Sequence, residues 1–252
     1  MSEEIPIIAL SNTKELSQPK VYRAWATICM GLAIGVFALL AMQILVAVVF
    51  RAAELAFNLN PVNEGLVTAW SIIATGLGGM LLMYFIARMN GNHSLVNYIG
   101  LQRLTWKIVL LALAAFIIAL VCIYGLSILW SFFLGDSGNS ANAEFIDDIY
   151  SGAGWLLLFV ATVVVAPVFE ESLFRGFLFV GLQSSRIGVV GTVILTSLVW
   201  ALLHMQYNLF GMFAIMVMGV VLGVTRYKTH SLWSAIIVHA MWNGMAFLQA
   251  LG

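Results

Sequence analysis

Long apolar runs separated by short polar segments form the hydropathy pattern of this chain. A helix that crosses a bilayer core about 30 Å thick needs roughly 20 apolar residues. Uncharged runs of that size occupy residues 24–50, 65–87, 108–135 and 231–252. Each of these four segments is a predicted transmembrane helix.

A fifth run, residues 187–225, is too long for a single span. It is interrupted by the polar segment 204–208, with the sequence His-Met-Gln-Tyr-Asn. A polar interruption of this kind is typical of the turn in a helical hairpin. We therefore expect two spans here, at 187–205 and 209–225.

The seventh predicted span lies within 152–184, and it differs from the others because it contains Glu170, Glu171 and Arg175. Pro167 removes a backbone donor from this segment and can break a helix, in which case an eighth span would result. The sequence therefore predicts an all-α, polytopic transmembrane helical bundle of seven spans, with an eighth if the segment breaks at Pro167.

Composition supports a location in lipid. Apolar residues make up 62% of the 252 residues, charged residues make up 9%, and the mean hydropathy is +1.03. A soluble domain carries about a quarter charged residues. The eleven basic and eleven acidic side chains balance, so the sequence lacks the excess of positive charge that a nucleic-acid partner requires. Membrane lipids are the expected surroundings.

The charges between the spans predict an orientation. Basic residues collect before the first span and in alternate loops, whereas loop 136–150 is acidic. The positive-inside rule then places the N-terminus in the cytoplasm of a multi-pass protein, in the cell membrane if the source is prokaryotic. The first twenty residues are polar, so we expect no cleaved secretory signal. We divide the chain into a polar tail (1–22), N-terminal spans (23–150) and a core that carries the chemistry (151–252).

Charged residues inside the seventh span require an explanation, because each costs about 2.5–3.5 kcal/mol at the bilayer centre on insertion scales. Glu171 and Arg175 are four residues apart with the carboxylate first, which favours an intrahelical ion pair. Glu170 is turned about 100° from Glu171 around the helix and is left over. A carboxylate in such a place needs a proton, a cation or a hydrogen-bond donor.

Two histidines on later spans are candidate partners for Glu170. His204 ends one span, and His239 lies inside the last one, with Asn243 four residues further on the same face. Each of these residues, taken alone, could equally have a structural role as a packed core residue or an interhelical contact. Together, they place hydrolytic side chains from three helices inside the membrane.

Three short motifs then carry a resemblance to a known family. They are Glu170-Glu171-x-x-x-Arg175, the pair Trp200 and His204, and His239-x-x-x-Asn243. In this order they resemble the motifs of the CPBP intramembrane proteases, which include the CAAX prenyl endopeptidases of the Rce1 type and the bacteriocin-processing or immunity proteins of the Abi group. The resemblance covers about 155–245. Phe is commoner than Trp at position 200, and we expect this difference to be a tolerated change in packing.

The resemblance implies a mechanism for peptide-bond hydrolysis. Glu170 would act as general base, and His204 would help to hold and deprotonate the attacking water. His239 and Asn243 would donate hydrogen bonds to the oxyanion. These four residues are the predicted catalytic set.

The remaining motif residues have supporting roles in this hypothesis. Glu171 and Arg175 would hold the helix and tune Glu170. The family has also been described as metal-dependent, and Glu170, His204 and His239 would be the ligands if zinc is bound. The chain lacks the His-Glu-x-x-His signature of zincins. The sequence leaves the metal question open.

The substrate and the rival functions also stay open at this stage. The resemblance implies a peptide or lipidated protein substrate, with removal of a C-terminal tripeptide after a prenylated cysteine as one case. A membrane transporter that uses Glu170 and His239 for protons or cations is an alternative. A second alternative is a non-catalytic self-immunity protein on the same fold.

Overall fold

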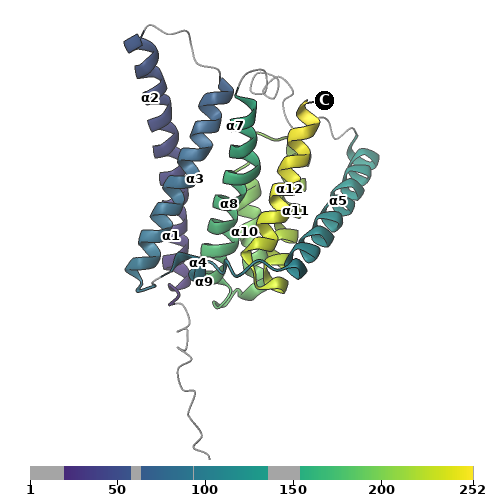
Figure 1. Cartoon of the computed structure of the whole chain (residues 1–252). Helices are drawn as coiled ribbons and strands as arrows, with labels where there is room; N and C mark the ends of the chain where they lie inside the picture. The colour runs from purple at the N-terminus through teal and green to yellow at the C-terminus, as the bar shows by residue number, and fades with distance from the viewer. Residues whose placement is uncertain (1–19, 58–63, 93, 136–153, 252) are drawn as a thin grey trace, which may run out of the picture.

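The computed structural model describes residues 20–57, 64–92, 94–135 and 154–251. Every regular element within these ranges is a helix, and the long helices run side by side (Figure 1). The polar tail up to residue 19 and the acidic loop 136–150 lie outside the described residues. The all-α prediction is confirmed for the described part of the chain.

Helices cover each of the predicted spans. The first span consists of α1 (Ala24–Val36), the π-helical segment η1 (Phe37–Ala41) and α2 (Met42–Phe57). It is followed by α3 (Glu64–Met89), the short α4 (Leu95–Tyr98) and α5 (Trp106–Leu134). The charged span consists of α7 (Trp155–Phe159), η2 (Val160–Val165), α8 (Ala166–Glu171), η3 (Ser172–Leu178) and α9 (Phe179–Leu182). The last three helices are α10 (Gly188–Leu202), α11 (Leu209–Thr229) and α12 (Leu232–Leu251).

Five of the described helical segments are long and apolar enough to cross a bilayer, which supports a multi-pass membrane protein. They are Ala24–Phe57, Gly65–Met89, Trp106–Leu134, Trp155–Leu182 and Leu209–Thr229. Helix α10 is apolar but has only 15 residues. The polar side chains of His239 and Asn243 lower the hydropathy of α12. A count of seven spans therefore stays a prediction.

The helix does not break at Pro167, and it runs without interruption from Trp155 to Leu182. The π-helical segment η2 ends at Val165, two residues before the proline, and the N–H of Ala166 donates to the carbonyl of Ala161, five residues back. This wider turn changes the hydrogen-bond register where Pro167 has no N–H to donate. The eighth span that a break would create is absent from the described residues.

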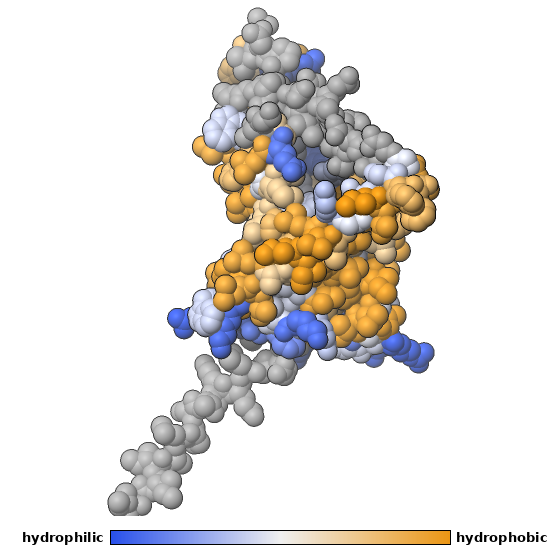
Figure 2. Space-filling view, turned by 90° about the vertical axis from the view of Figure 1, so that its right-hand side faces the viewer, coloured by the Kyte–Doolittle hydropathy of each residue, from blue (hydrophilic) through white to orange (hydrophobic). Residues whose placement is uncertain are grey.

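The surface carries an apolar band, with hydrophilic groups concentrated at the lower end in the view of Figure 2. The start of α1, the end of α3, the start of α5 and the end of α11 meet at one end of the bundle (Figure 1). The described basic residues of the predicted cytoplasmic loops, such as Arg88 and Lys228, are near these helix ends. They share one end of the bundle, as the positive-inside argument requires. The side of the membrane on which this end lies stays a prediction.

Close packing of α10 against α11 positions the hairpin that carries His204. A side chain on Gly219 would place its Cβ 2.8 Å from the Cβ of Ser197, and one on Gly223 would approach Val193 to 3.1 Å. The small residues therefore let the two backbones approach closely, as the spacing of the glycines predicts. In the turn that follows α10, the side chain of Asn208 accepts a hydrogen bond from the N–H of Gly211 at 2.8 Å and caps α11.

Candidate functional site

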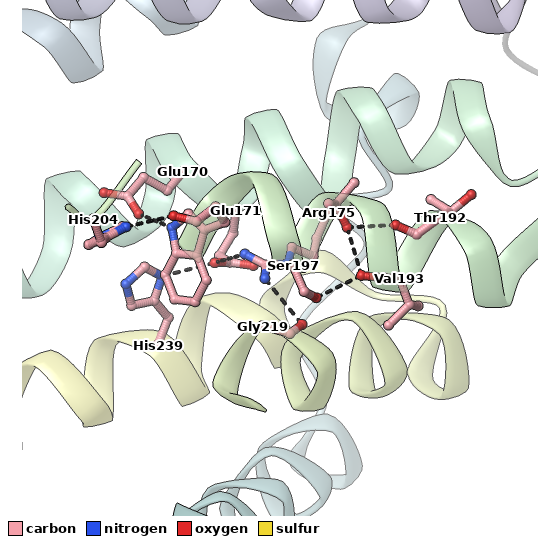
Figure 3. A network of polar contacts seen from close by, with 11 residues as sticks. Glu170, Glu171, Arg175, Thr192, Val193, Ser197, His204, Gly219 and His239 are labelled. Carbon is pink, nitrogen blue, oxygen red and sulfur yellow. Dashed lines mark hydrogen bonds and ion pairs between the residues drawn. The ribbon is translucent and has the colours of Figure 1, made fainter. Parts of the chain in front are cut away.

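A buried ion pair anchors the site. Arg175 Nη1 lies 2.9 Å from Glu171 Oε1, and both side chains are 0% exposed. Arg175 Nη2 donates to the carbonyl of Gly219 on α11 at 3.1 Å. The predicted intrahelical pair is confirmed, and it also ties the charged helix to the α10–α11 hairpin (Figure 3).

His239 joins the same carboxylate from α12. Its Nδ1 lies 2.9 Å from Glu171 Oε1, and the residue is 3% exposed. The sequence predicted His239 as a partner of Glu170, whereas the hydrogen bond of its Nδ1 in this structure is to the neighbouring Glu171. A carboxylate oxygen only accepts, so Nδ1 of His239 carries the hydrogen and Nε2 is free for another contact.

Glu170 and His204 are connected through Trp200. The indole Nε1 of Trp200 donates to Glu170 Oε2 at 2.7 Å, and Nδ1 of His204 donates to the main-chain carbonyl of Trp200 at 2.8 Å. In the neutral form of the ring, this second bond places the lone pair on Nε2. Glu170 and His204 are both half-buried, whereas Trp200 is 4% exposed.

Trp200 lies in the last turn of α10 and contacts Glu170. This contact places the C-terminal end of α10 beside Glu170 on the Trp155–Leu182 helix. Because Glu170 is near the middle of the Trp155–Leu182 helix, the short α10 stops at that level. The turn after α10 therefore brings His204 to the carboxylate (Figure 3).

Asn243 lies one turn after His239 and reaches the same long helix. Its Nδ2 donates to the main-chain carbonyl of Thr162 at 2.9 Å. In a helix, the carbonyl of Thr162 would accept from the N–H of residue 166 or residue 167. Ala166 donates to Ala161 instead, and Pro167 has no N–H, so neither residue donates to the Thr162 carbonyl. Asn243 supplies the missing donor. The predicted common face of His239 and Asn243 is confirmed.

Tyr207 is a neighbour of the site that the sequence interpretation treated only as a turn residue. Its ring centroid lies 6.2 Å from that of His204. Burial and then the negative charge of Glu170 raise the pKa of Tyr207, so the phenol keeps its proton above the usual range. The signal that could have identified it is its place beside His204 in a polar cluster between two apolar runs.

The predicted zinc ligands do not fit a preformed metal centre. Glu170, His204 and His239 each have an oxygen or nitrogen engaged by a protein group, namely Trp200 Nε1, the Trp200 carbonyl and Glu171. Among the described residues, no group of three or more His, Cys, Asp or Glu side chains is arranged to hold a metal ion.

Comparison with known proteins identifies a similarity in the C-terminal part of the chain. Residues 152–245 match the profile of the family described as type II CAAX prenyl endopeptidase Rce1-like. Neither the curated proteins nor the solved structures give a match. The matched residues contain all three motifs, and the resemblance predicted from the sequence is confirmed over this range. The similarity is to a protease family, and it does not favour a transporter or an immunity protein.

Proposed function

We propose that this protein is an intramembrane endopeptidase in which Glu170 is the general base for hydrolysis of a peptide bond at the membrane. One observation carries the proposal. Within the segment that matches the endopeptidase family, Trp200 brings the half-buried Glu170 and His204 together, and the other two charged residues of the Trp155–Leu182 helix, Glu171 and Arg175, neutralise each other. Ionisable groups so placed in a membrane helix are expected to be functional.

Glu170 and His204 can share the attacking water. Oε2 of Glu170 is occupied by the indole, which leaves Oε1 to accept a proton from water. Nε2 of His204 has a lone pair because Nδ1 donates to Trp200, so it can accept the second hydrogen of that water. The water oxygen attacks the carbonyl carbon, Glu170 takes the proton, and it then gives this proton to the nitrogen of the leaving peptide.

His239 and Asn243 are the proposed oxyanion donors. Nδ1 of His239 already donates to Glu171, so its Nε2 donates only when the ring is protonated. The carboxylate of Glu171 stabilises that positive charge. The amide of Asn243 has two hydrogens, one of which is held by the Thr162 carbonyl, and the second is available to the oxyanion. Each donor would contribute about 3–4 kcal/mol to transition-state stabilisation.

The proposed substrate class is a peptide that ends in a CAAX-type sequence, cut after a prenylated cysteine to release a tripeptide. The name of the matched family supports this choice. The proposed mechanism assigns every proton transfer to side chains of the protein and routes no step through a metal ion.

The test is cleavage of an internally quenched, farnesylated CAAX peptide by the full-length protein in detergent. We expect Glu170→Gln and His204→Ala to lose at least a hundredfold in kcat, in line with the usual contribution of a general base of about 10²–10⁴. Glu54→Gln is the matched control, because Glu54 is on α2 and pairs with Arg51. Equal cleavage by the wild type and Glu170→Gln would refute the assignment of Glu170.

Two further arms separate the parts of the proposal. A zinc chelator should leave cleavage unchanged, and loss of cleavage that added zinc restores would contradict the metal-free mechanism. An unprenylated peptide of the same sequence tests the substrate class. If folded protein cuts it as fast as the farnesylated one, the prenyl group is not recognised.

A further inference from the structure

Arg226 is a buried cation in the last turn of α11, far from Glu170, and no carboxylate among the described residues pairs with it. The residue is 7% exposed. Its Nη2 donates to the main-chain carbonyl of Ile99 at 3.4 Å, which is long for such a bond, and its Nε is buried without a partner. Nη1 makes no hydrogen bond to a described residue and is not fully enclosed. Most of the five N–H donors of this guanidinium are therefore unused.

The guanidinium of Arg226 lies in a formed site between α9, α11 and the turn after α4. Its carbon atom is 5.9 Å from the ring centroid of Phe179 on α9. Gly100 has a φ of 75°, and a side chain there would collide with Nη2 of Arg226. The carbonyl of Gly100 accepts from the N–H of Leu232 at 3.0 Å, which holds the turn against the start of α12. The backbone thus leaves room for this one side chain.

The end of the bundle that holds Arg226 is strongly basic. Within the described ranges it has eight lysine and arginine residues at or beside the helix ends and no acidic residue (Figure 1). Glu54 and Glu64 are at the opposite ends of α2 and α3, and the other two described carboxylates are near the middle of the charged helix. An uncompensated buried charge is unfavourable, so an external anion would stabilise Arg226. The eight basic residues are Lys20, Arg23, Arg88, Arg103, Lys107, Arg186, Arg226 and Lys228.

We propose that Arg226 is the centre of a binding site for the phosphodiester group of an anionic membrane lipid. A planar guanidinium binds two oxygens of one phosphate in parallel. Arg226 is three residues from the end of the membrane helix α11, which is about 4.5 Å along the axis, at the level where lipid headgroups lie. The exposed Val224 on the same helix is an apolar surface for an acyl chain. Basic sites between helices at this interface are typical of anionic headgroup recognition.

Lys228 provides a matched control, because it has the same charge and lies in the same turn of α11 but is exposed. Diffuse attraction to an anionic surface acts on both residues, whereas a bonded phosphate requires the buried guanidinium. The two effects separate at about 0.5 M NaCl, where the Debye length is about 4 Å. At this salt concentration only the direct hydrogen bonds remain.

The experiment measures lipid binding to the full-length protein in dodecyl maltoside by native mass spectrometry and by the thermal unfolding midpoint. The probes are phosphatidylglycerol, zwitterionic phosphatidylcholine and inorganic phosphate. We expect one tightly held phosphatidylglycerol, which raises the midpoint of the wild type, and no comparable rise with the other two probes. At high salt, Arg226→Met should bind phosphatidylglycerol about tenfold more weakly, and Lys228→Met should bind it as the wild type does.

Two further comparisons separate lipid binding from a purely structural role of Arg226. Without anionic lipid, Arg226→Met should unfold at no lower temperature than the wild type, because it removes a buried charge that has no partner. Added phosphatidylglycerol should then stabilise only the wild type. Arg226→Lys keeps the charge but cannot bind two oxygens in parallel, so it should also lose about tenfold in affinity.

Three results would overturn the inference. The first is equal loss of binding in Arg226→Met and Lys228→Met, which would mean that the lipid responds only to the surface charge. The second is a variant Arg226→Met that is destabilised to the same extent with and without phosphatidylglycerol. The third is stabilisation by inorganic phosphate as large as that by the lipid, which would assign the site to free phosphate. The assay contains no peptide, so its outcome is independent of the proposed hydrolysis.

Discussion

The bond between Asn243 and the carbonyl of Thr162 allows a stability prediction in which a second substitution should cancel the effect of the first. Asn243→Ala removes the side chain that donates to this carbonyl at 2.9 Å. Pro167→Ala restores a main-chain N–H at the position five residues after Thr162, where the register of η2 would direct it to the same carbonyl. In the Pro167→Ala background the asparagine should no longer be needed for this bond.

The expected magnitude follows from the burial of the groups. An acceptor left without a donor costs about 1–3 kcal/mol, and because Thr162 and Asn243 are both half-buried we expect ~1.5 kcal/mol for Asn243→Ala in the wild-type background. With Ala at position 167 the same substitution should cost ~0.5 kcal/mol, which gives a coupling energy of about 1 kcal/mol between the two positions.

The assay is reversible unfolding by SDS in mixed micelles, followed by circular dichroism, for the wild type, both single variants and the double variant. Gln249→Ala is the control on α12, because this side chain is exposed, and its midpoint should equal that of the wild type. If Asn243→Ala costs the same free energy with Pro or Ala at position 167, Asn243 does not replace the missing donor. The reasoning about the π-helical turn would then be refuted.

Other predictions concern the buried pair, the helix contact and the phenol. Glu171→Gln leaves the fully buried Arg175 without its partner and should lower the free energy of unfolding by about 3–5 kcal/mol; an unchanged SDS midpoint would contradict the pair's importance. Gly219→Ala should cost about 1–3 kcal/mol by overpacking against Ser197, and Ser197→Gly in the same chain should recover stability, whereas additive losses would argue against this contact. The pKa of Tyr207 is raised above 10.0 in the folded protein, so the unfolded chain loses this proton first as the pH rises. The free energy of unfolding is therefore unaffected by Tyr207 below pH 10.0 and falls at higher pH. The difference in ultraviolet titration between wild type and Tyr207→Phe measures it, and ionisation at or below pH 10.0 would disprove the shift.

The sequence predicted the helices well, and it also predicted the contact between Glu171 and Arg175. Apolar runs mark membrane helices because a backbone in lipid must satisfy its own hydrogen bonds, and this requirement acts on each segment locally. The spacing of Glu171 and Arg175 predicted their ion pair, since neighbours four residues apart meet on any α-helical face.

Residue spacing could not predict which side chains from different helices form hydrogen bonds with one another. His239 was predicted beside Glu170 and is bonded to Glu171, although the two carboxylates are adjacent in sequence. Which of the two carboxylates bonds His239 depends on how the Trp155–Leu182 helix is rotated about its axis relative to α12. The π-helical segments η2 and η3 alter that rotation. Apolar periodicity does not reveal a π-turn, because it depends on a shift of backbone hydrogen bonds.

By itself the sequence determined that this is a helical membrane protein whose polar motifs lie on its last helices, because the cost of placing charge in lipid acts on every residue separately. Only the tertiary structure decided which groups meet. The end of α10 at the level of Glu170 makes Trp200 the donor to that carboxylate, and the missing N–H of Pro167 makes the Thr162 carbonyl the partner of Asn243. Both contacts depend on the rotation and relative height of packed helices, and these are set by side chains distant in sequence.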